Sequence, residues 1–318
     1  MFLGIDLGGT HIKAVLLNES GQVVHEKQLA TCASEGTAAV MAKLSALIVD
    51  ADRGFPGELQ RIGLAVPGVL DQERKRVVLL PNFPDSWHGF ELREHLMLVT
   101  GQEVELINDA RAAAFAELNL GAGRGISDFL LLVLGTGVGG GVVLKGELIL
   151  GSRGVAGELG HQVIQPDGLL CGCGNRGCLE TIASGPAIAS AAIRVLKQGL
   201  PTLMRELVQD DVSKVNSSIV DEAAVRGDRF AIDILKGAAN ALVQAIRNGI
   251  AILNPGAVII GGGVARSGFL LDLVRRGLES RVILFPSTLG GVDVVEAVFG
   301  TYAGAVGAAA WAMSRRTS

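Results

Sequence analysis

The chain has 318 residues, a length that predicts about two domains. Hydrophobic residues make up 49% of it and charged residues 19%, so the composition excludes a disordered chain and provides for a large buried core. The net charge of −4 counts against a nucleic-acid partner, because nucleic-acid binding usually needs a basic face. The 44 glycines occur in short runs without a repeat, which indicates tight turns and close backbone approaches.

The sequence predicts a cytoplasmic protein with no membrane partner. It begins directly with an apolar stretch that contains Asp6, without the basic region that opens a signal peptide. The longest uncharged runs, 248–265 and 297–314, are interrupted by glycine or proline. Both runs are shorter than the roughly 20 apolar residues that a membrane-spanning helix needs, so we expect them to be core elements.

The first third of the chain predicts a strand meander followed by alternating helices and strands. Pro67 and Gly68 end one buried strand sharply, and Asn108 and Asp109 follow another strand at the start of a helix. The expected strands are 2–6, 12–18, 22–28, 61–66 and 103–107, and the expected helices are 37–51 and 110–118.

The opening pattern then recurs. The segments LGIDLGGTHIKAVLL and LLLVLGTGVGGGVVLK share one strand–glycine turn–strand layout, a weak internal repeat that indicates a duplicated lobe. The expected strands here are 129–134, 139–145 and 258–260, and the expected helices are 230–253 and 304–314. The alternation of strands and helices predicts two α/β lobes with mixed sheets and a ligand cleft between them.

Two glycine turns are candidate phosphate loops. In the segment Asp6–Thr10 the glycines let consecutive backbone N–H groups point outward and bind an anion, and Thr10 adds a hydroxyl donor. Asp6 is a candidate ligand for Mg²⁺ through water. The turn Gly135–Gly137 can present backbone N–H groups to an anion in the same way, and Gly261–Gly263 suits a nucleotide base or ribose. No Walker P-loop motif occurs, and each loop taken alone is equally compatible with a plain hairpin turn.

Asp109 is the candidate general base. The dipole of the helix that follows keeps a carboxylate at its N-terminus ionised, and phosphoryl transfer to an alcohol needs an Asp that accepts the hydroxyl proton. The alternative is that Asn108 or Asp109 is only a helix cap. Glu158 and Glu180 are further polar groups in glycine-rich surroundings, with solvated surface positions as their alternative.

Four residues predict a structural zinc site, namely His161, Cys171, Cys173 and Cys178. Nitrogen and sulfur ligands without an open position are typical of such sites, and buried free thiols are the alternative. The zinc would fix the loop that carries Glu158 and Glu180, and His161 would offer its second ring nitrogen to a substrate hydroxyl. The fourth cysteine, Cys32, stands apart and is expected to be a core residue.

These residues resemble the ROK family of sugar kinases, within the actin/hexokinase-like ATPase superfamily. The resemblance covers nearly the whole chain, and the last two of its motifs together are highly specific. The motifs are GIDLGGTHIKAVLLN, VPG at 66–68, PNFPDSW at 81–87, NDARAAAFAE at 108–117, LGTGVGGG at 134–141, GELGH at 157–161 and CGCGNRGCLE at 171–180.

The resemblance implies a two-lobed, actin-like (ribonuclease H-like) fold with ATP in the cleft, a hexose phosphorylated at its 6-hydroxyl, and a homodimer or homotetramer. It implies Asp109 as catalytic base, Mg²⁺ at Asp6 and zinc at His161 and the three cysteines. We expect lobes of 1–107 plus 302–318 and of 108–301. The implied sugar contacts are Gly68, Asn82, Asn108, Asp109, Glu158, His161 and Glu180, and the implied ATP contacts are Gly9, Thr10, Lys13, Thr136, Gly137 and Gly262.

The family also contains transcriptional repressors with an N-terminal helix-turn-helix. Here GIDLGGT begins at residue 4, which together with Asp109 favours an enzyme. The segment with Asn82 and Trp87 is similar to the glucokinases, so glucose is the expected sugar. Arg111 stands where family glucokinases often have Asn, so an N-acetylmannosamine kinase, another hexose kinase or a non-catalytic sugar-binding regulator remain alternatives.

Overall fold

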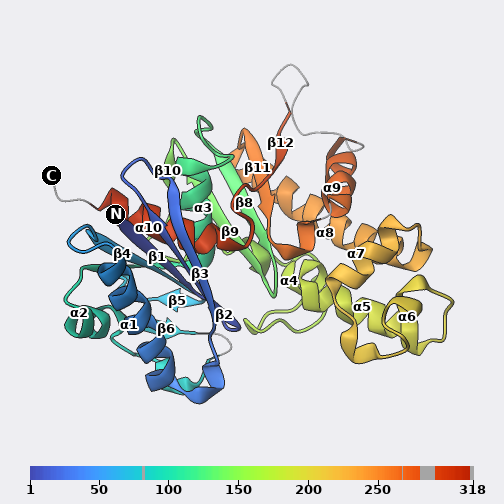
Figure 1. The fold of residues 1–318 in the computed structure, drawn as a ribbon. Helices are drawn as coiled ribbons and strands as arrows, with labels where there is room; N and C mark the ends of the chain where they lie inside the picture. The colour runs from blue at the N-terminus through green and yellow to red at the C-terminus, as the bar shows by residue number, and fades with distance from the viewer. Residues whose placement is uncertain (81–82, 267, 280–290, 316–318) are drawn as a thin grey trace. The chain divides into compact units, whose positions relative to one another are not determined.

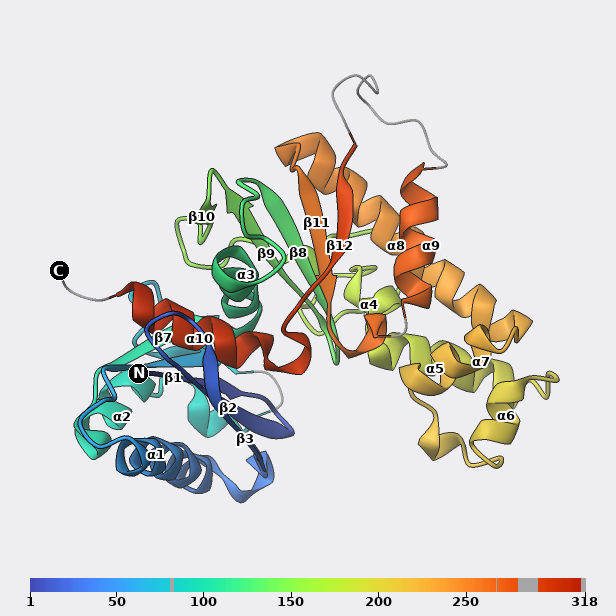
Figure 2. The ribbon, with the colours of Figure 1, turned by 45° about the horizontal axis from the view of Figure 1, so that its top comes forward.

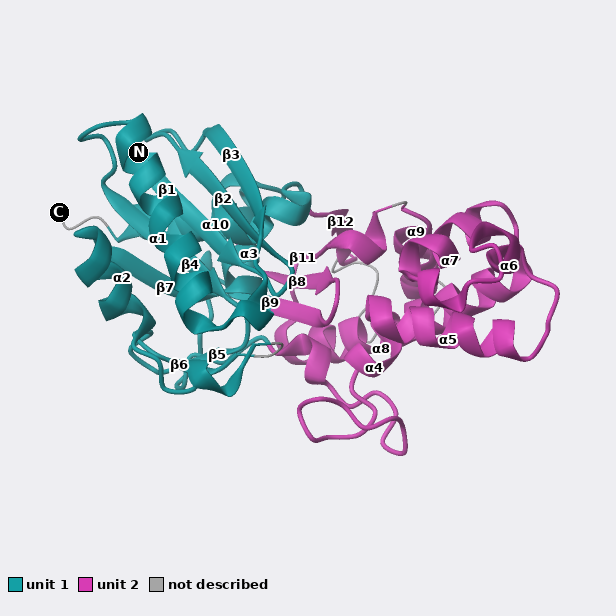
Figure 3. Ribbon diagram, turned by 60° about the horizontal axis from the view of Figure 1, so that its bottom comes forward, with its two compact units in different colours: residues 1–125, 141–157, 298–318 teal, residues 126–140, 158–297 magenta. Residues whose placement is uncertain are grey.

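The structure is a computed structural model that describes residues 1–80, 83–266, 268–279 and 291–315. The chain divides into two compact units (Figure 3). The first contains Met1–Gly125, Gly141–Gly157 and Val298–Ser318, and the second contains Ile126–Gly140 and Glu158–Ala297.

The first unit is built on a mixed five-stranded sheet with the order β3-β2-β1-β4-β7. The antiparallel meander β1–β2–β3 forms one side, and β4 and β7 continue from β1 as parallel strands. A small antiparallel sheet of β5 and β6 accompanies it. The strands are β1 Phe2–Leu7, β2 His11–Leu17, β3 Val23–Ala30, β4 Arg61–Val66, β5 Val69–Leu70, β6 Val77–Leu79 and β7 Val104–Asn108.

Alternation along the strands gives this sheet two apolar faces, because successive side chains point to opposite sides. Leu3, Ile5 and Leu7 of β1 belong to a core cluster shared with α1 and α2. Phe2 of the same strand belongs to a cluster shared with α10 and α3. The helices of this unit are α1 Thr37–Gly54, α2 Leu92–Thr100, α3 Asp109–Leu120 and α10 Ala303–Ser314, with short 3₁₀ turns at Ala33–Glu35, Asp85–Trp87 and Gly300–Tyr302.

Helix α10 approaches the sheet so closely that only glycine fits at several contacts. It lies along β1 and beside α3 (Figure 2). A methyl group at Gly63 would overlap the carbonyl oxygen of Ala308, and one at Gly307 would overlap that of Ala112. The apolar, alanine-rich sequence of α10 therefore reflects backbone-to-backbone packing on both the sheet and α3.

A buried carboxylate connects the end of α3 to the segment that leads into α10. Glu117 is fully buried. Its Oε2 accepts a hydrogen bond from the backbone N–H of Ala122 at 2.8 Å, and its Oε1 accepts from those of Val298 at 2.9 Å and Phe299 at 3.3 Å. Three backbone donors satisfy the charge, which makes its burial tolerable.

The second five-stranded sheet has the order β10-β9-β8-β11-β12, with β11 parallel to both β8 and β12 (Figure 1). The boundary between the units, at Gly140 and Gly141, falls within β9. Helix α8 packs against α5, α7 and α9 in the second unit. The strands are β8 Phe129–Leu134, β9 Val138–Leu144, β10 Glu147–Leu148, β11 Ala257–Gly261 and β12 Asp293–Glu296. The helices are α4 Glu180–Ala183, α5 Gly185–Lys197, α6 Leu203–Leu207, α7 Ser217–Val225, α8 Arg229–Leu253 and α9 Phe269–Glu279, with 3₁₀ turns at Leu159–His161, Val212–Lys214 and Gly263–Ala265.

The predicted elements all form, with ends that differ by a few residues. The observed units differ from the lobes expected from the sequence, because α3 and residues 141–157 group with the first unit. One prediction is wrong: Cys32 is exposed. It follows the end of β3 in a left-handed backbone conformation (φ 52°). Among the described residues, no helix is long and apolar enough to cross a membrane.

We predict that Gly63→Ala strongly destabilises the protein, because the new methyl group must displace the α10 backbone. Overpacking of this kind typically costs about 1–3 kcal/mol or more. The control is Gly237→Ala in α8, where a methyl group would meet no described atom within 4 Å. That change should be neutral or stabilising by up to about 1 kcal/mol, because alanine has the higher helix propensity. Urea unfolding measures both, and equal stabilities would contradict the close packing.

Candidate functional site

The first phosphate loop is the turn between β1 and β2. The N–H of Gly8 donates to the carbonyl of His11 at 3.1 Å, and the Thr31 hydroxyl donates to the carbonyl of Gly8 at 2.6 Å. A methyl group at Gly8 would lie 2.7 Å from the His11 carbonyl oxygen, so the turn requires glycine there. Gly9 and Thr10 are exposed at its tip. The loop therefore presents the two residues that the sequence assigned to ATP.

Asp6 lies at the end of β1, on the face that α10 covers. A methyl group at Gly304, in the first turn of α10, would lie 2.7 Å from the Asp6 carboxylate. The pKa of Asp6 is raised to about 7, chiefly by burial and also by the negative charge of Asp109, while the positive charge of Lys13 opposes both effects. Two carboxylates that disfavour each other's ionisation form a natural site for a cation. The arrangement fits the Mg²⁺ that was assigned to Asp6.

Lys13 lies opposite Asp6 in the register of β1 and β2. Its Nζ donates to the carbonyl oxygen of Thr301 at 2.7 Å and lies 5.9 Å from the centre of the Tyr302 ring. The ammonium group thus holds the turn that leads into α10. The structure places Lys13 near Asp6, while its contact with ATP stays a prediction.

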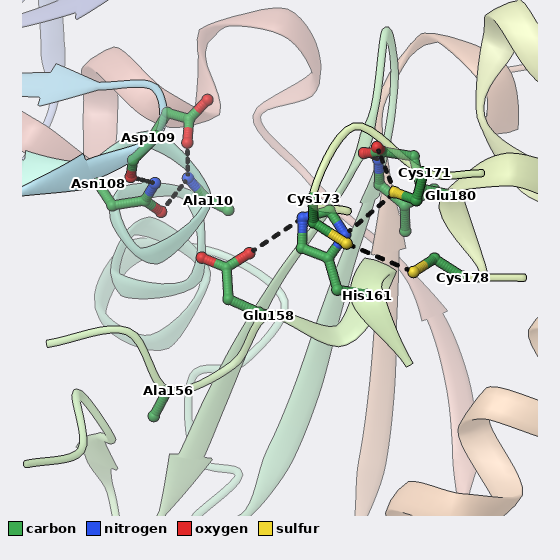
Figure 4. Close-up of polar contacts among 12 residues, drawn as sticks. Asn108, Asp109, Ala110, Ala156, Glu158, His161, Cys171, Cys173, Cys178 and Glu180 are labelled. Atoms are coloured by element: carbon green, nitrogen blue, oxygen red, sulfur yellow. Dashed lines mark hydrogen bonds and ion pairs between the residues drawn. The ribbon is translucent and has the colours of Figure 1, made fainter. Parts of the chain in front are cut away.

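Asn108 and Asp109 form the corner between β7 and α3 (Figure 4). Asn108 is the helix cap: its Oδ1 accepts from the N–H groups of Ala110 at 3.0 Å and Arg111 at 3.2 Å. Its Nδ2 donates to the carbonyl of Gly68 at 2.9 Å, so two predicted sugar contacts lie together. The Asp109 Oδ1 accepts from the Ala110 N–H at 2.8 Å, within the first turn of α3. The capping role therefore falls chiefly to Asn108.

Arg111 supports this corner, a role that the sequence did not reveal. Its side chain is 2% exposed. Nη1 donates to the Asn108 Oδ1 at 2.8 Å, and Nε donates to the carbonyl of Ala156 at 3.0 Å. With Gly68 and Asn108 it lines a small pocket of the first unit that also contains Arg74 and Val155. The arginine thus fixes the amide that is expected to face the sugar.

Asn82, another predicted sugar contact, lies outside the described residues. The motif residue Trp87, five positions further on, is fully buried. Its ring makes edge contacts with Phe83 and Phe90, with ring centres 5.6 Å and 5.5 Å away. The tryptophan of the motif therefore anchors this segment to the core of the first unit.

The second phosphate loop and the third glycine turn lie close together in the second unit. The N–H of Gly135 donates to the carbonyl of Gly137 at 2.9 Å, and Thr136 is exposed between them. Gly262 has a φ of 94°, and a methyl group there would overlap the carbonyl oxygen of Leu134. The turn after β11 therefore packs on the end of β8, directly before the phosphate loop. This brings together the predicted nucleotide residues Thr136, Gly137 and Gly262.

The four predicted zinc ligands converge in the second unit (Figure 4). The ligand atoms of His161, Cys171, Cys173 and Cys178 all lie within 4.8 Å of one another. The His161 Nδ1 is 3.6 Å from the Cys171 Sγ, and the Cys173 and Cys178 Sγ atoms are 3.6 Å apart. Tetrahedral zinc with Zn–S bonds of about 2.3 Å needs sulfur atoms roughly 3.8 Å apart. The cluster therefore fits a structural zinc.

The second ring nitrogen of His161 faces a carboxylate. His161 Nε2 lies 3.9 Å from the Glu158 Oε2, on the side of the ring away from Cys171. Histidine ligands of zinc commonly have such a partner, which fixes the ring orientation. Burial raises the pKa of the Cys178 thiol to about 12, so a bound cation is needed to hold its thiolate at neutral pH.

Comparison with solved structures identifies the class of protein. The fold matches the crystal structure of a ROK family glucokinase from Streptomyces griseus in complex with glucose and AMPPNP, with a TM-score of 0.86 and 31% identity over 98% of this chain and 99% of that one. The mixed sheets and the paired glycine loops thus belong to the actin-like ATPase fold. The ROK family model matches residues 2–315, and the chain belongs to the ROK family.

Two curated relatives match over almost their entire lengths. The chain is 38% identical to a glucokinase of Thermotoga maritima over 312 residues, which is 96% of this chain and 95% of the relative. It is 32% identical to an N-acetylmannosamine kinase of Escherichia coli over 314 residues, which is 99% of each chain.

We predict that Asp6→Asn changes how stability depends on pH in the metal-free protein. The folded state raises the Asp6 pKa from 3.8 to about 7, so folding binds a proton. The stabilisation present below pH 4 is lost as the pH rises towards 7. The neutral amide escapes this loss. The unfolding free energy of Asp6→Asn relative to wild type should therefore rise between pH 5 and 8, by on the order of 2 kcal/mol. Denaturant titrations in EDTA measure it, and a difference that is constant with pH would argue against the shift.

We predict that Cys173→Ser removes bound zinc, whereas the isolated, exposed Cys32→Ser keeps it. Loss of one thiolate removes a strong ligand and leaves the ring of His161 unsupported. Metal analysis of the purified proteins should give about one zinc per chain for wild type and Cys32→Ser, as expected for one four-ligand site. Equal zinc contents in both variants would contradict the assignment.

Proposed function

We propose that this chain is an ATP-dependent hexose kinase that transfers the γ-phosphoryl group to the 6-hydroxyl of glucose. The observation that carries the proposal is Asp109, a carboxylate at the N-terminus of α3 beside the helix cap Asn108, in a chain that matches a glucokinase over nearly its whole length. A phosphoryl transfer to an alcohol requires a base at the acceptor hydroxyl and charge neutralisation at the phosphate.

Asp109 acts as the general base in this proposal. Its carboxylate accepts the proton of the sugar 6-hydroxyl as the oxygen attacks the γ-phosphorus, and the bond from that phosphorus to the bridging oxygen breaks so that ADP leaves. The N-terminal end of α3 favours the negative charge on Asp109 before the transfer. Asn108, held by Gly68 and Arg111, keeps the adjacent backbone in place. This preorganisation matters because misplacement of a reacting group by about 1 Å can cost about 100-fold in rate.

Asp6 is proposed to hold Mg²⁺ through water, and the cation would neutralise charge that develops on the transferred group. The carboxylate is disfavoured as an anion while Asp109 is ionised nearby, so a bound cation restores its charged form. Gly9 and Thr10 are proposed to contact the phosphates, with Lys13 adding positive charge beside Asp6. The further proposed nucleotide contacts are Thr136, Gly137 and Gly262.

The proposed sugar contacts are Gly68, Asn82, Asn108, Asp109, Glu158, His161 and Glu180. Carboxylates accept hydrogen bonds from sugar hydroxyls, and the ring N–H of a zinc-bound imidazole donates one to a hydroxyl oxygen. The zinc would be bound by the Nδ1 of His161, which leaves the Nε2–H directed at Glu158 and at a hydroxyl oxygen that binds there.

Glucose is the proposed substrate because the glucokinase of Thermotoga maritima is more similar to this chain than the N-acetylmannosamine kinase is. The second candidate, N-acetylmannosamine, is favoured by the match to that kinase over 99% of both chains. The proposal includes a cytoplasmic location, which the sequence pattern predicts, and a homodimeric or homotetrameric assembly, which the family resemblance implies.

We predict that Asp109→Asn lowers kcat by about 100- to 10,000-fold, the usual contribution of a general base, with little change in sugar affinity. Asp233→Asn, on the exposed side of α8, is the control and should keep full activity. A coupled assay of ADP release across glucose, N-acetylmannosamine, fructose and allose measures the rates. A full rate for Asp109→Asn would disprove the base assignment. Activity on N-acetylmannosamine alone would reject glucose, and sugar binding without any turnover by wild type would indicate a non-catalytic regulator.

A further inference from the structure

Glu180 connects the zinc cluster to the second phosphate loop. It is the first residue of α4, two positions after the zinc ligand Cys178. Its backbone is fixed on both sides: the Leu179 N–H donates to the carbonyl of Gln162 at 2.9 Å, and the Thr181 hydroxyl donates to that of Cys178 at 2.7 Å. The position of the Glu180 side chain is therefore set by the folding of the cluster.

The two oxygens of the Glu180 carboxylate have different partners. Oε2 accepts a hydrogen bond from the backbone N–H of Val138 at 3.0 Å. Oε1 lies 3.7 Å from the Sγ of Cys171, on the zinc side. Figure 4 shows the carboxylate turned towards this sulfur atom. One side chain thus reaches both the cluster and the start of β9.

The contact with the phosphate loop is close. Val138 directly follows the turn Gly135–Gly137 and is buried. A methyl group at Gly137 would overlap the Glu180 Oε2, so the glycine gives the carboxylate room to reach the Val138 N–H. Charge-assisted hydrogen bonds of this type are about twice as strong as neutral ones. The carboxylate therefore holds the end of the loop whose N–H groups are proposed to face the nucleotide.

We propose that Glu180 is a positioning residue for the nucleotide loop as well as a sugar contact, and that it couples the binding of the two substrates. The proposal rests on the function proposed above, in which Glu180 contacts the sugar and residues 136–137 contact ATP. A sugar hydroxyl that donates to Oε1 restricts the carboxylate and with it the bond from Oε2 to Val138. The nucleotide then binds to a loop that is already ordered, so bound sugar raises the affinity for nucleotide. By thermodynamic linkage, bound nucleotide raises the affinity for sugar by the same factor.

The first experiment compares Glu180→Ala with Glu158→Ala. Glu158 is the matched control, because it is a proposed sugar contact of the same unit whose carboxylate lies by His161. Binding of AMPPNP with Mg²⁺ is measured by calorimetry without sugar, and binding of glucose is measured without nucleotide. We expect both variants to lose glucose affinity. Only Glu180→Ala should also weaken AMPPNP binding, by about tenfold or more, as expected for loss of one hydrogen bond to a charged group.

Unchanged AMPPNP affinity in a zinc-loaded, folded Glu180→Ala protein would overturn the proposal. Equal weakening in Glu158→Ala would overturn it too, because the effect would then not be specific to the Val138 contact. The measurement of AMPPNP affinity needs neither sugar nor turnover. It therefore tests whether Glu180 positions the nucleotide loop even when glucose is not the substrate. Failure of the proposed function would instead appear as wild-type protein that turns over no sugar.

The second experiment tests the contact between Glu180 and the nucleotide loop by changing the loop. Gly137→Ala should displace the flexible end of Glu180 and leave the backbone in place, and so weaken glucose binding measured without nucleotide. Gly135→Ala is the control, because a methyl group there would meet no described atom within 4 Å. It should leave glucose affinity as in wild type. Equal glucose affinities in the two variants would contradict the coupling, since a change in the nucleotide loop would then not reach the sugar contact.

Discussion

The parallel alignment of β1, β4 and β7 determines where the chemistry of the first unit lies. Asp6 is opposite Ala65, and Val66 is opposite Asn108, so the three strands end at one edge of the sheet. Ligands of open α/β sheets bind beyond the carboxyl ends of such strands. Residues far apart in the sequence therefore meet there, and the electrostatic interaction between Asp6 and Asp109 follows directly from the register. Because the carboxylates of Asp6 and Asp109 lie close enough to disfavour two negative charges, this edge of the sheet favours the binding of a cation.

The segment 158–180 of the second unit is held in place in a different way. It contains little regular structure, and backbone hydrogen bonds and glycine turns fold it around the four clustered side chains. Gly174 and Gly177 adopt φ values of 92° and 69°, which a residue with a side chain rarely accepts. A metal can stabilise such a segment where a hydrophobic core cannot. Glu180 connects this cluster to β9 by accepting a hydrogen bond from the Val138 N–H.

The sequence predicted the strands, the long helices and the clustering of His161 with Cys171, Cys173 and Cys178, because each has a local pattern: apolar runs, periodicity or close spacing. It did not place α3 and residues 141–157 in the first unit, because α3 packs on α10 through small residues such as Ala112 and Gly307, which carry no polarity signal. It also did not reveal that Arg111 is buried against Asn108, or that Glu180 reaches Val138, since both contacts depend on the tertiary fold. Cys32 was misplaced because cysteine is usually buried and the left-handed turn that exposes it has no glycine to mark it.

The place of α10 has a consequence for how the protein forms during synthesis. The strands β1 and β4 are made before the second unit, but one face of their sheet is covered by residues 303–314, which are made after it. Domains whose segments are contiguous can fold as they emerge, from the N-terminus onward. The first unit cannot do so: its apolar face stays open while the whole second unit is translated. The nascent chain therefore carries a period of exposure in which chaperones and competing chains have access to Phe2, Val15 and their neighbours.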